Sequence, residues 1–339
     1  MHRKGTQMGV RHHRLAFDPF PLLSDRHAQT IIGAQISLAT SPPSTTRVIP
    51  LPDGDQLALE VSTPPAWQPT DPTVVLIHGL CGCHASPYMI RMAHKLWSSG
   101  IRAVRMNMRG CGSGEGLARH PYHSGRSSDV LAVLADSRHL APQSPVTAIG
   151  FSLGGNLLLK LAGELQTEAA TYLKQAIAIS PPVDLAASVR TFAQPSNRVY
   201  EWRFIRLLKA AVAARHARFP DLPTISLPKW LSIYEFDNLY TAPLCGFADA
   251  DDYYARSSAA PLVPQISIPC RILFAADDPL IDTTTFDAMT LPSNIQVYHT
   301  LRGGHLGFLG IPGRPGGYRW MDAQLLEWVR AALPASALT

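Results

Sequence analysis

Short, largely apolar runs recur along the chain, separated by longer segments in which apolar residues repeat every three or four positions. The short runs have the length of strands, and the one at 74–77 is unbroken, as expected of a strand buried on both faces. They lie at residues 74–77, 101–106, 146–151, 176–179, 271–274 and 295–298. The longer segments have the period of helices. They lie at residues 86–99, 130–140, 153–165, 283–289 and 318–332. This alternation predicts a mostly parallel, doubly wound α/β sheet covered by helices on both faces.

Two departures from the alternation indicate how the domain is organised. Apolar runs at 47–51 and 56–61 flank an Asp-Gly turn, which predicts an antiparallel hairpin. Between residues 183 and 266 no strand pattern is evident, and a basic amphipathic helix at 199–219 precedes an aromatic-rich segment. We interpret this stretch as a helical cap inserted above the pocket of the sheet domain. The expected units are a tail and packed segment at 1–40, the first part of the core at 41–182, the cap at 183–266 and the second part of the core at 267–339.

The composition is that of a globular protein with a large core. Hydrophobic residues make up 46% of the 339 positions and charged residues 16%, which agrees with one large domain carrying an insertion. The net charge of +5 is modest, and Arg3, Lys4, Arg11 and Arg14 contribute much of it. We interpret residues 1–14 as a solvated tail; a weak attraction to an anionic membrane surface is the less favoured alternative. No basic motif with interleaved aromatic residues predicts nucleic-acid binding.

Targeting and metal-binding signals are also missing from the sequence. No apolar stretch approaches 18 residues, and the basic start is not followed by the apolar region of a signal peptide. The five cysteines are unevenly spaced, which favours free thiols in a reducing cytoplasm, where we expect the protein. Cys81 and Cys83 with the adjoining His84 have no second ligand pair at zinc-finger spacing. We therefore expect no metal, and no organic cofactor.

A Gly-x-Ser-x-Gly motif, from Gly150 to Gly154, joins a predicted strand directly to a predicted helix. Such a sharp bend places Ser152 at its tip in a strained conformation, and the two glycines let the chain fold back without a clash. The start of the following helix offers free N–H groups and a positive partial charge to an oxyanion. Ser152 is therefore the candidate nucleophile; the alternative is a serine that merely caps the helix.

A serine hydroxyl becomes nucleophilic only when a base removes its proton, and a histidine in that role needs a carboxylate to orient it. His305 is the candidate base, because its loop follows the last predicted strand and contains two glycines that allow a close approach. His299 stands at the end of that strand, where we expect it to pack or to face solvent. Four histidines that precede Ser152 are not excluded by their order in the sequence. They are His84, His94, His120 and His123.

The candidate acid comes from the loop after the strand at 271–274. Asp278 is preferred because it lies three residues beyond Ala275. This matches the Gly-x-x-Asp spacing that is common in α/β-hydrolases, with Ala275 in place of the glycine. Asp277 would then shape the turn before Pro279, although the sequence does not decide between the two carboxylates with certainty. The resulting order of Ser, Asp and His is that of α/β-hydrolases.

Two backbone N–H groups are expected to bind the oxyanion. The N–H of Leu153, directly after the nucleophile, is the first candidate. The second is the N–H of Leu80, because His78-Gly79 follows a buried strand and the glycine allows a close backbone approach.

Taken together, these motifs resemble the YheT-like branch of the α/β-hydrolases, whose animal relatives are lipases and esterases with an α/β-hydrolase domain. The resemblance extends over roughly residues 15–330 and rests on eight stretches. They are His78-Gly79-Leu80, Ser86-Pro87-Tyr88, Asn107-Met108-Arg109-Gly110-Cys111, Tyr122-His123-Ser124-Gly125, Gly150-Phe151-Ser152-Leu153-Gly154-Gly155-Asn156, Gly246-Phe247-Ala248-Asp249, Asp277-Asp278-Pro279 and Gly303-Gly304-His305-Leu306-Gly307-Phe308. Cys81 and Cys83 depart from it, since relatives often carry polar or acidic residues there.

The resemblance implies an α/β-hydrolase fold and a serine carboxylic-ester hydrolase that uses Ser152, Asp278 and His305 on a small-molecule ester. Acyl transfer to another acceptor, thioester hydrolysis and non-catalytic ligand binding remain as alternatives. Because no long apolar lid helix is evident, we expect a preference for short to medium acyl chains. The natural substrate and the oligomeric state do not follow from the sequence.

Overall fold

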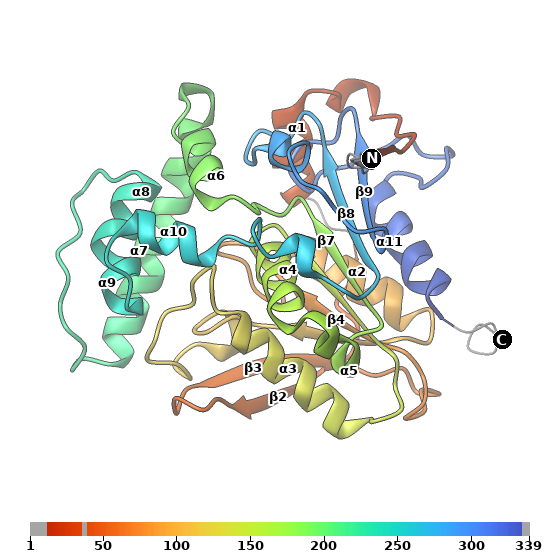
Figure 1. Cartoon of the computed structure of the whole chain (residues 1–339), viewed down its shortest axis with the longest axis horizontal. Helices are drawn as coiled ribbons and strands as arrows, with labels where there is room; N and C mark the ends of the chain where they lie inside the picture. The colour runs from red at the N-terminus through yellow and green to blue at the C-terminus, as the bar shows by residue number, and fades with distance from the viewer. Residues whose placement is uncertain (1–11, 36–38, 334–339) are drawn as a thin grey trace, which may run out of the picture.

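The computed structural model describes residues 12–35 and 39–333. Within them the chain forms one sheet with the strand order β1-β9-β8-β7-β6-β4-β5-β3-β2 (Figure 1). Strands β4 to β9 and β1 run parallel to one another, and β3 joins this group by pairing antiparallel with β5. The bounds are β1 (His12–Arg14), β2 (Thr45–Pro50), β3 (Gln56–Ser62), β4 (Thr73–Ile77), β5 (Arg102–Met106), β6 (Val146–Phe151), β7 (Gln175–Ile179), β8 (Cys270–Ala275) and β9 (Ile295–Thr300). The mostly parallel sheet predicted from the sequence is confirmed.

Two apolar layers cover the sheet, one on each face. Along β4, Val75 and Ile77 face the layer that contains α3 (Ser127–Leu140) and α4 (Leu153–Leu165). Val74 and Leu76 face the layer that contains α2 (Pro87–Trp97) and α11 (Trp320–Ala331). Successive side chains of a strand point to opposite faces, so a strand covered on both sides is apolar at most of its positions. This is why β4, β6 and β7 appear in the sequence as largely apolar runs, whereas the buried β5 also carries Arg102 and Arg105.

The remaining elements are short and connect these layers. The helices are α1 (Arg26–Gln35) near the N-terminus and α5 (Ala169–Tyr172) after α4. Short 3-10 turns lie at η1 (Pro21–Leu23), η2 (Gly112–Gly114), η3 (Gln166–Glu168), η4 (Pro195–Asn197), η6 (Val263–Gln265) and η7 (Thr283–Phe286). The hairpin predicted around the Asp-Gly turn is present, with β2 antiparallel to β3.

Two local predictions are wrong. The helix expected at 283–289 is only the 3-10 turn η7 (Thr283–Phe286), because three consecutive threonines are poor helix formers. Residues 12–14 are not a solvated tail: they form β1, which pairs in parallel with β9. Without β1, the outer side of β9 would expose a row of unpaired backbone groups, and these groups bind the segment that includes Arg14. Arg3, Lys4 and Arg11 lie outside the described residues.

Between β7 and β8 the chain leaves the sheet and forms a group of helices beside it (Figure 1). We call residues 183–266 the cap. The helices are α6 (Leu185–Phe192), α7 (Arg198–Arg218), α8 (Ile233–Phe236), α9 (Ala242–Cys245) and α10 (Ala250–Ser257), with one π-helical turn, η5 (Asp237–Thr241), between α8 and α9. The amphipathic pattern expected for α7 is incomplete, since Val199 and Trp202 are 70% and 54% exposed. Within the described residues, every helix is too short or too polar to traverse a lipid bilayer.

Candidate active site

Ser152 lies at the bend between β6 and α4, with φ of 51° and ψ of −120°. A non-glycine residue rarely adopts a positive φ, and such strain is characteristic of functional sites. The bend requires both flanking glycines. A Cβ atom on Gly150 would lie 2.3 Å from the carbonyl oxygen of Gly154, and one on Gly154 would lie 2.4 Å from the carbonyl oxygen of Ile77. The motif in the sequence therefore reflects the lack of space around the serine.

The structure brings together the serine, histidine and aspartate selected from the sequence. His305 Nε2 lies 2.9 Å from Ser152 Oγ. His305 Nδ1 lies 2.9 and 3.1 Å from the two carboxylate oxygens of Asp278. Because a carboxylate can only accept, Nδ1 carries the proton, and Nε2 can accept the serine hydroxyl proton. His305 and Asp278 are both buried, so little water competes for these hydrogen bonds.

The two neighbouring aspartates have different partners. Asp278 faces His305, and its Oδ1 also accepts the backbone N–H of Leu280 at 2.9 Å. Asp277 points instead to the loop that carries the histidine, where its Oδ1 accepts the backbone N–H of Gly304 at 3.0 Å. Burial raises the pKa of the Asp277 carboxyl. Asp278 is thus the carboxylate in contact with the imidazole, and Asp277 holds the backbone of the histidine loop.

Helix α1 supports the histidine loop from the other side, a role that the sequence did not reveal. Thr30 Oγ1 accepts the backbone N–H of His305 at 2.8 Å. The Gln29 side chain accepts the N–H of Leu309 at 2.7 Å and donates to its carbonyl at 3.1 Å. The contact is close enough that a Cβ on Gly304 would lie 2.4 Å from the α1 backbone. No local pattern marks these residues, because their partners lie near the opposite end of the chain.

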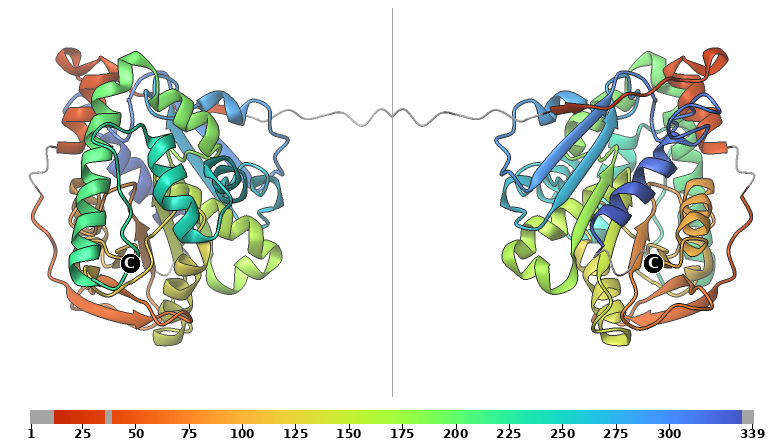
Figure 2. Two further views of the ribbon diagram at one scale, coloured as in Figure 1. Left: turned by 90° about the vertical axis from the view of Figure 1, so that its left-hand side faces the viewer. Right: turned by 90° about the vertical axis from the view of Figure 1, so that its right-hand side faces the viewer.

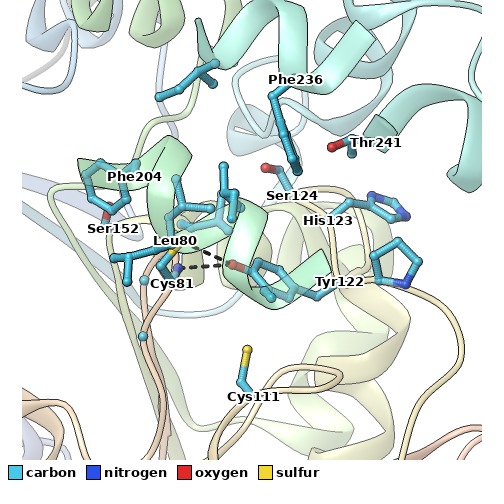
Figure 3. A pocket seen from close by; sticks show the side chains of 18 of the residues that line it. Leu80, Cys81, Cys111, Tyr122, His123, Ser124, Ser152, Phe204, Phe236 and Thr241 are labelled. Carbon is cyan, nitrogen blue, oxygen red and sulfur yellow. Dashed lines mark hydrogen bonds between the residues drawn. The ribbon is translucent and has the colours of Figure 1, made fainter. Parts of the chain in front are cut away.

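The loop after β4 approaches the serine closely. A Cβ on Gly79 would lie 3.1 Å from that of Ser152. The N–H of Gly79 donates to Tyr88 Oη at 2.9 Å. The N–H of Cys81 donates to Tyr122 Oη at 3.0 Å (Figure 3). Between them, the N–H of Leu80 donates to none of the described residues, and the same holds for the N–H of Leu153. The two tyrosine hydroxyls therefore fix the loop on both sides of an unused donor.

His78, directly before this loop, has a structural function. Its Nδ1 donates to the carbonyl of Gly79 at 2.8 Å, and its Nε2 accepts the N–H of Met108 at 3.0 Å. Complete burial lowers the pKa of His78 to about 4, so the ring is neutral at pH 7. The imidazole thus ties the end of β4 to the chain that follows β5.

Comparison with known proteins identifies the family. The sequence profile described as "alpha/beta hydrolase fold" matches residues 72–310, which is more than half of the chain. The Escherichia coli protein named "Putative esterase YheT" is 33% identical over 331 residues, covering 95% of both chains. The chain belongs to the α/β-hydrolases, in their YheT-like branch.

More distant relatives agree with this assignment. Human phospholipase ABHD3 is 29% identical to this α/β-hydrolase over 306 residues, or 87% of this chain and 74% of the human one. Two solved structures share the fold. A 2,6-dihydroxy-pseudo-oxynicotine hydrolase has a TM-score of 0.58 at 18% identity, covering 88% of this chain and 71% of its own. An esterase of Pyrococcus furiosus has a TM-score of 0.53 at 16% identity, covering 86% and 90%.

A cavity of about 680 Å³ opens at Ser152 in this α/β-hydrolase. Its walls come from the loop after β4 and from the cap, and Figure 3 shows Leu80, Phe204 and Phe236 among the lining residues. Helix α7 contributes residues from Val199 to Arg215 along its length. The cap therefore provides a long helix beside the pocket, although it is a basic helix and not the apolar lid helix whose absence suggested short to medium acyl chains. That expectation stays a prediction.

The cysteines near the loop after β4 do not supply a second nucleophile. Cys81 and Cys111 line the cavity. Burial raises the pKa of the Cys81 thiol to about 12 and that of Cys111 further still. Both are therefore protonated at pH 7, and a thiol attacks only as its thiolate. Cys83 is half-buried beside them.

An acidic group near the cavity already holds a cation from the chain. Asp53, Asp55 and His120 lie close enough to share a metal ion. However, Arg109 Nη1 lies 2.6 Å from Asp53 and 2.7 Å from Asp55, and its other nitrogens bind Asp129 at 2.8 Å. The buried guanidinium supplies the positive charge that these carboxylates require. Asp55 also accepts the backbone N–H groups of residues 119 and 120, and so steadies the segment that leads to Tyr122.

Proposed function

We propose that this α/β-hydrolase is a carboxylic-ester hydrolase that acts through an acyl-enzyme on Ser152. His305 accepts the serine proton as Oγ attacks the ester carbonyl, and then donates it to the departing alcohol. In the second half of the reaction, His305 takes a proton from water and the resulting hydroxide adds to the acyl carbon. The bond between Ser152 Oγ and the acyl carbon then breaks, and His305 returns the proton to Oγ. Asp278 holds the imidazole in the tautomer that both halves need and stabilises its charged form.

The oxyanion of each tetrahedral intermediate would be bound by the N–H groups of Leu80 and Leu153. Both donors flank the serine, and both are unused by other described residues. Donors fixed in advance stabilise the charge without the cost of reorienting, and losing one typically costs about 3 kcal/mol of transition-state stabilisation. Gly79 makes the arrangement sterically feasible.

The observation that carries the proposal is the continuous hydrogen-bonded series from Ser152 Oγ through His305 to Asp278. The test is labelling with a fluorophosphonate, together with hydrolysis of p-nitrophenyl esters. We expect labelling and hydrolysis by the wild-type chain, and loss of both in Ser152→Ala. A chain that neither reacts with the probe nor hydrolyses any ester of the series would instead be a ligand-binding protein with this fold.

The cavity also indicates a class of acyl group. Its lining is largely apolar and includes Leu185, Phe204 and Ile281. A volume of about 680 Å³ lies within the range of small-molecule sites and exceeds what a short acyl group fills. Burying each further CH₂ group contributes about 0.8 kcal/mol, close to four-fold in kcat/KM, until the cavity is filled. We therefore propose medium to long acyl chains.

Acyl transfer to an alcohol is the second candidate. The apolar lining limits access of water to the acyl-enzyme, and one yeast relative, 26% identical over 264 residues, is named medium-chain fatty acid ethyl ester synthase/esterase 2. Adding ethanol to the p-nitrophenyl assay and measuring ethyl ester against free acid distinguishes the two. Free acid as the main product at low ethanol supports hydrolysis, and ethyl ester as the main product supports transfer.

A further inference from the structure

The cap carries two exposed tryptophans, each beside a cation. Trp202 on α7 is 54% exposed, and the Arg206 guanidinium lies 5.2 Å from its ring centre. Trp230, on the segment between α7 and α8, is 73% exposed, and Lys229 Nζ lies 5.6 Å from its ring centre. Single exposed apolar residues are ordinary, whereas apolar side chains that gather beside polar or charged ones mark an interaction site.

The segment that carries Trp230 is held against the side of α7 on which Trp202 stands. Lys209 stands two turns beyond Trp202 along the same side of the helix. Its Nζ donates to the carbonyls of Pro228 and Lys229, the latter at 3.0 Å, and so holds the segment of Trp230 against that side. We call this surface the cap face: Arg198, Trp202, Arg206, Lys209, Lys229 and Trp230. Figure 2, left, views the cap from outside, where α7 is the long green helix.

The charge of the cap face has one sign. Within the described residues, no ion pair engages Arg198, Arg206, Lys209 or Lys229. The acidic side chains nearest in sequence are occupied elsewhere: Glu201 accepts the N–H of Ile233, and Glu235 accepts that of Ser232. Cations and tryptophan rings side by side suit the boundary of an anionic membrane, where the ring sits among the headgroups and the cations meet lipid phosphates.

The cap face also adjoins the mouth of the cavity. Val199, Arg203 and Leu207, spaced four residues apart on α7, are exposed and also line the cavity. Residues three and four apart are neighbours on a helix surface, so the row of Trp202 and Arg206 lies directly beside this rim. Ile31 of α1, 45% exposed, lines the cavity too. A lipid that leaves a bilayer at the cap face would meet an apolar entrance.

We propose that the cap face binds the surface of an anionic phospholipid bilayer and so presents the cavity to membrane-borne substrates. This goes beyond the proposed ester hydrolysis and can be tested without it, because Ser152→Ala leaves the cap face unchanged. The experiment measures how much of the Ser152→Ala variant sediments with lipid vesicles. The vesicles consist of phosphatidylcholine alone or of phosphatidylcholine with phosphatidylglycerol. We expect binding that rises with phosphatidylglycerol and weakens with salt.

Variants locate the contact. Arg206→Glu in this background should weaken vesicle binding by roughly five-fold for each unit of charge changed, and Trp202→Ala with Trp230→Ala should weaken it further. Arg330→Glu and Leu140→Ala are the matched controls, because α11 and α3 end away from the cap (Figure 1). Circular dichroism should show the same fold in all variants. When Ser152 is intact, the cap-face variants should still hydrolyse a soluble short ester. They should lose the hydrolysis of esters that are carried in vesicles.

Three results would overturn the proposal. The first is that Ser152→Ala fails to sediment with anionic vesicles at low salt. The second is equal weakening by the cap-face and control variants. The third is concentration-dependent dimerisation, measured by analytical ultracentrifugation, that Trp202→Ala abolishes, which would assign the cap face to a second copy of the chain.

Discussion

Thr30 accepts a hydrogen bond from the backbone N–H of His305 at 2.8 Å, across 275 positions of the chain. The threonine hydroxyl donates in turn to the carbonyl of Arg26 within α1. The position of the imidazole therefore depends on α1, a helix near the N-terminus that lies between β1 and β2 in the chain. A misplacement of about 1 Å in a catalytic group can cost as much as 10²-fold in rate.

We predict that Thr30→Val lowers kcat by about five-fold, which corresponds to the loss of one hydrogen bond worth about 1 kcal/mol in positioning. Thr30 lines the cavity, but its hydroxyl is engaged by the carbonyl of Arg26 and the N–H of His305, so KM for a soluble ester should change less than kcat. Thr30→Ser retains the hydroxyl and should restore most of kcat. Equal kcat in Thr30→Val and wild type would show that the loop holds its position without this bond.

The two tyrosines that fix the loop after β4 give a second prediction. Tyr122→Phe and Tyr88→Phe each remove the hydroxyl that accepts a backbone N–H beside Leu80. A loosened donor should lower kcat by about 10-fold to 100-fold, less than the outright loss of an oxyanion donor. Tyr298→Phe, which removes a hydroxyl bonded only to Gln296 on an outer strand, is the control. Hydrolysis of esters measures the change in kcat. Inhibition by a trifluoromethyl ketone, which forms an oxyanion at the same place, measures the matching loss of affinity.

The adjoining aspartates should respond differently to the same substitution. Asp278→Asn removes the carboxylate that orients the imidazole, and in serine hydrolases the corresponding change lowers kcat by about 10⁴-fold. Asp277→Asn retains an oxygen that can still accept the N–H of Gly304, so we expect a loss of about ten-fold or less. Steady-state kinetics on one p-nitrophenyl ester checks both. The reverse ranking would move the catalytic role to Asp277.

Substitution of the bend glycine tests the steric account of the motif. Gly154→Ala would place a Cβ 2.4 Å from the carbonyl oxygen of Ile77, so backbone must shift. We expect a loss of about 1–3 kcal/mol in the free energy of unfolding, together with loss of activity. Gly114→Ala is the control, because its Cβ would lie 3.6 Å from the nearest atom in ordinary contact. Urea unfolding measures both, and similar losses would contradict the account.

His78 gives a prediction on pH. Its folded pKa, about 4, is below the ordinary value of 6.5, so the unfolded chain binds a proton first as the pH falls. The contribution of His78 to the free energy of unfolding is fully present above pH 6.5. It is lost as the pH falls from 6.5 to 4 and does not change further below pH 4. The slope is at most about 1.4 kcal/mol per pH unit. His78→Gln should be less stable than wild type at pH 7, with a difference that narrows by pH 4.5 in urea unfolding. A constant difference would contradict it.

The parallel sheet could be predicted from the amino-acid pattern alone, because strands buried on both faces are mostly apolar and so stand out as short apolar runs. The sequence also indicated where a nucleophile would stand, since only glycine fits at Gly150 and Gly154, and the placement of Asp278 and His305 after strands that share one edge follows from parallel topology. The edge strand β1 was missed because three residues with no apolar pattern pair only when β9 is already in place.

Other features were decided only by the tertiary structure. Thr30 supports His305, and Tyr88 and Tyr122 hold the backbone on either side of Leu80. Lys209 holds the segment of Trp230 against α7. Each of these contacts joins residues from separate elements. Hydrogen bonds of this kind impose no periodicity and no spacing on the sequence. They depend on how packed layers bring distant backbone groups within about 3 Å of a side chain, which local patterns do not encode.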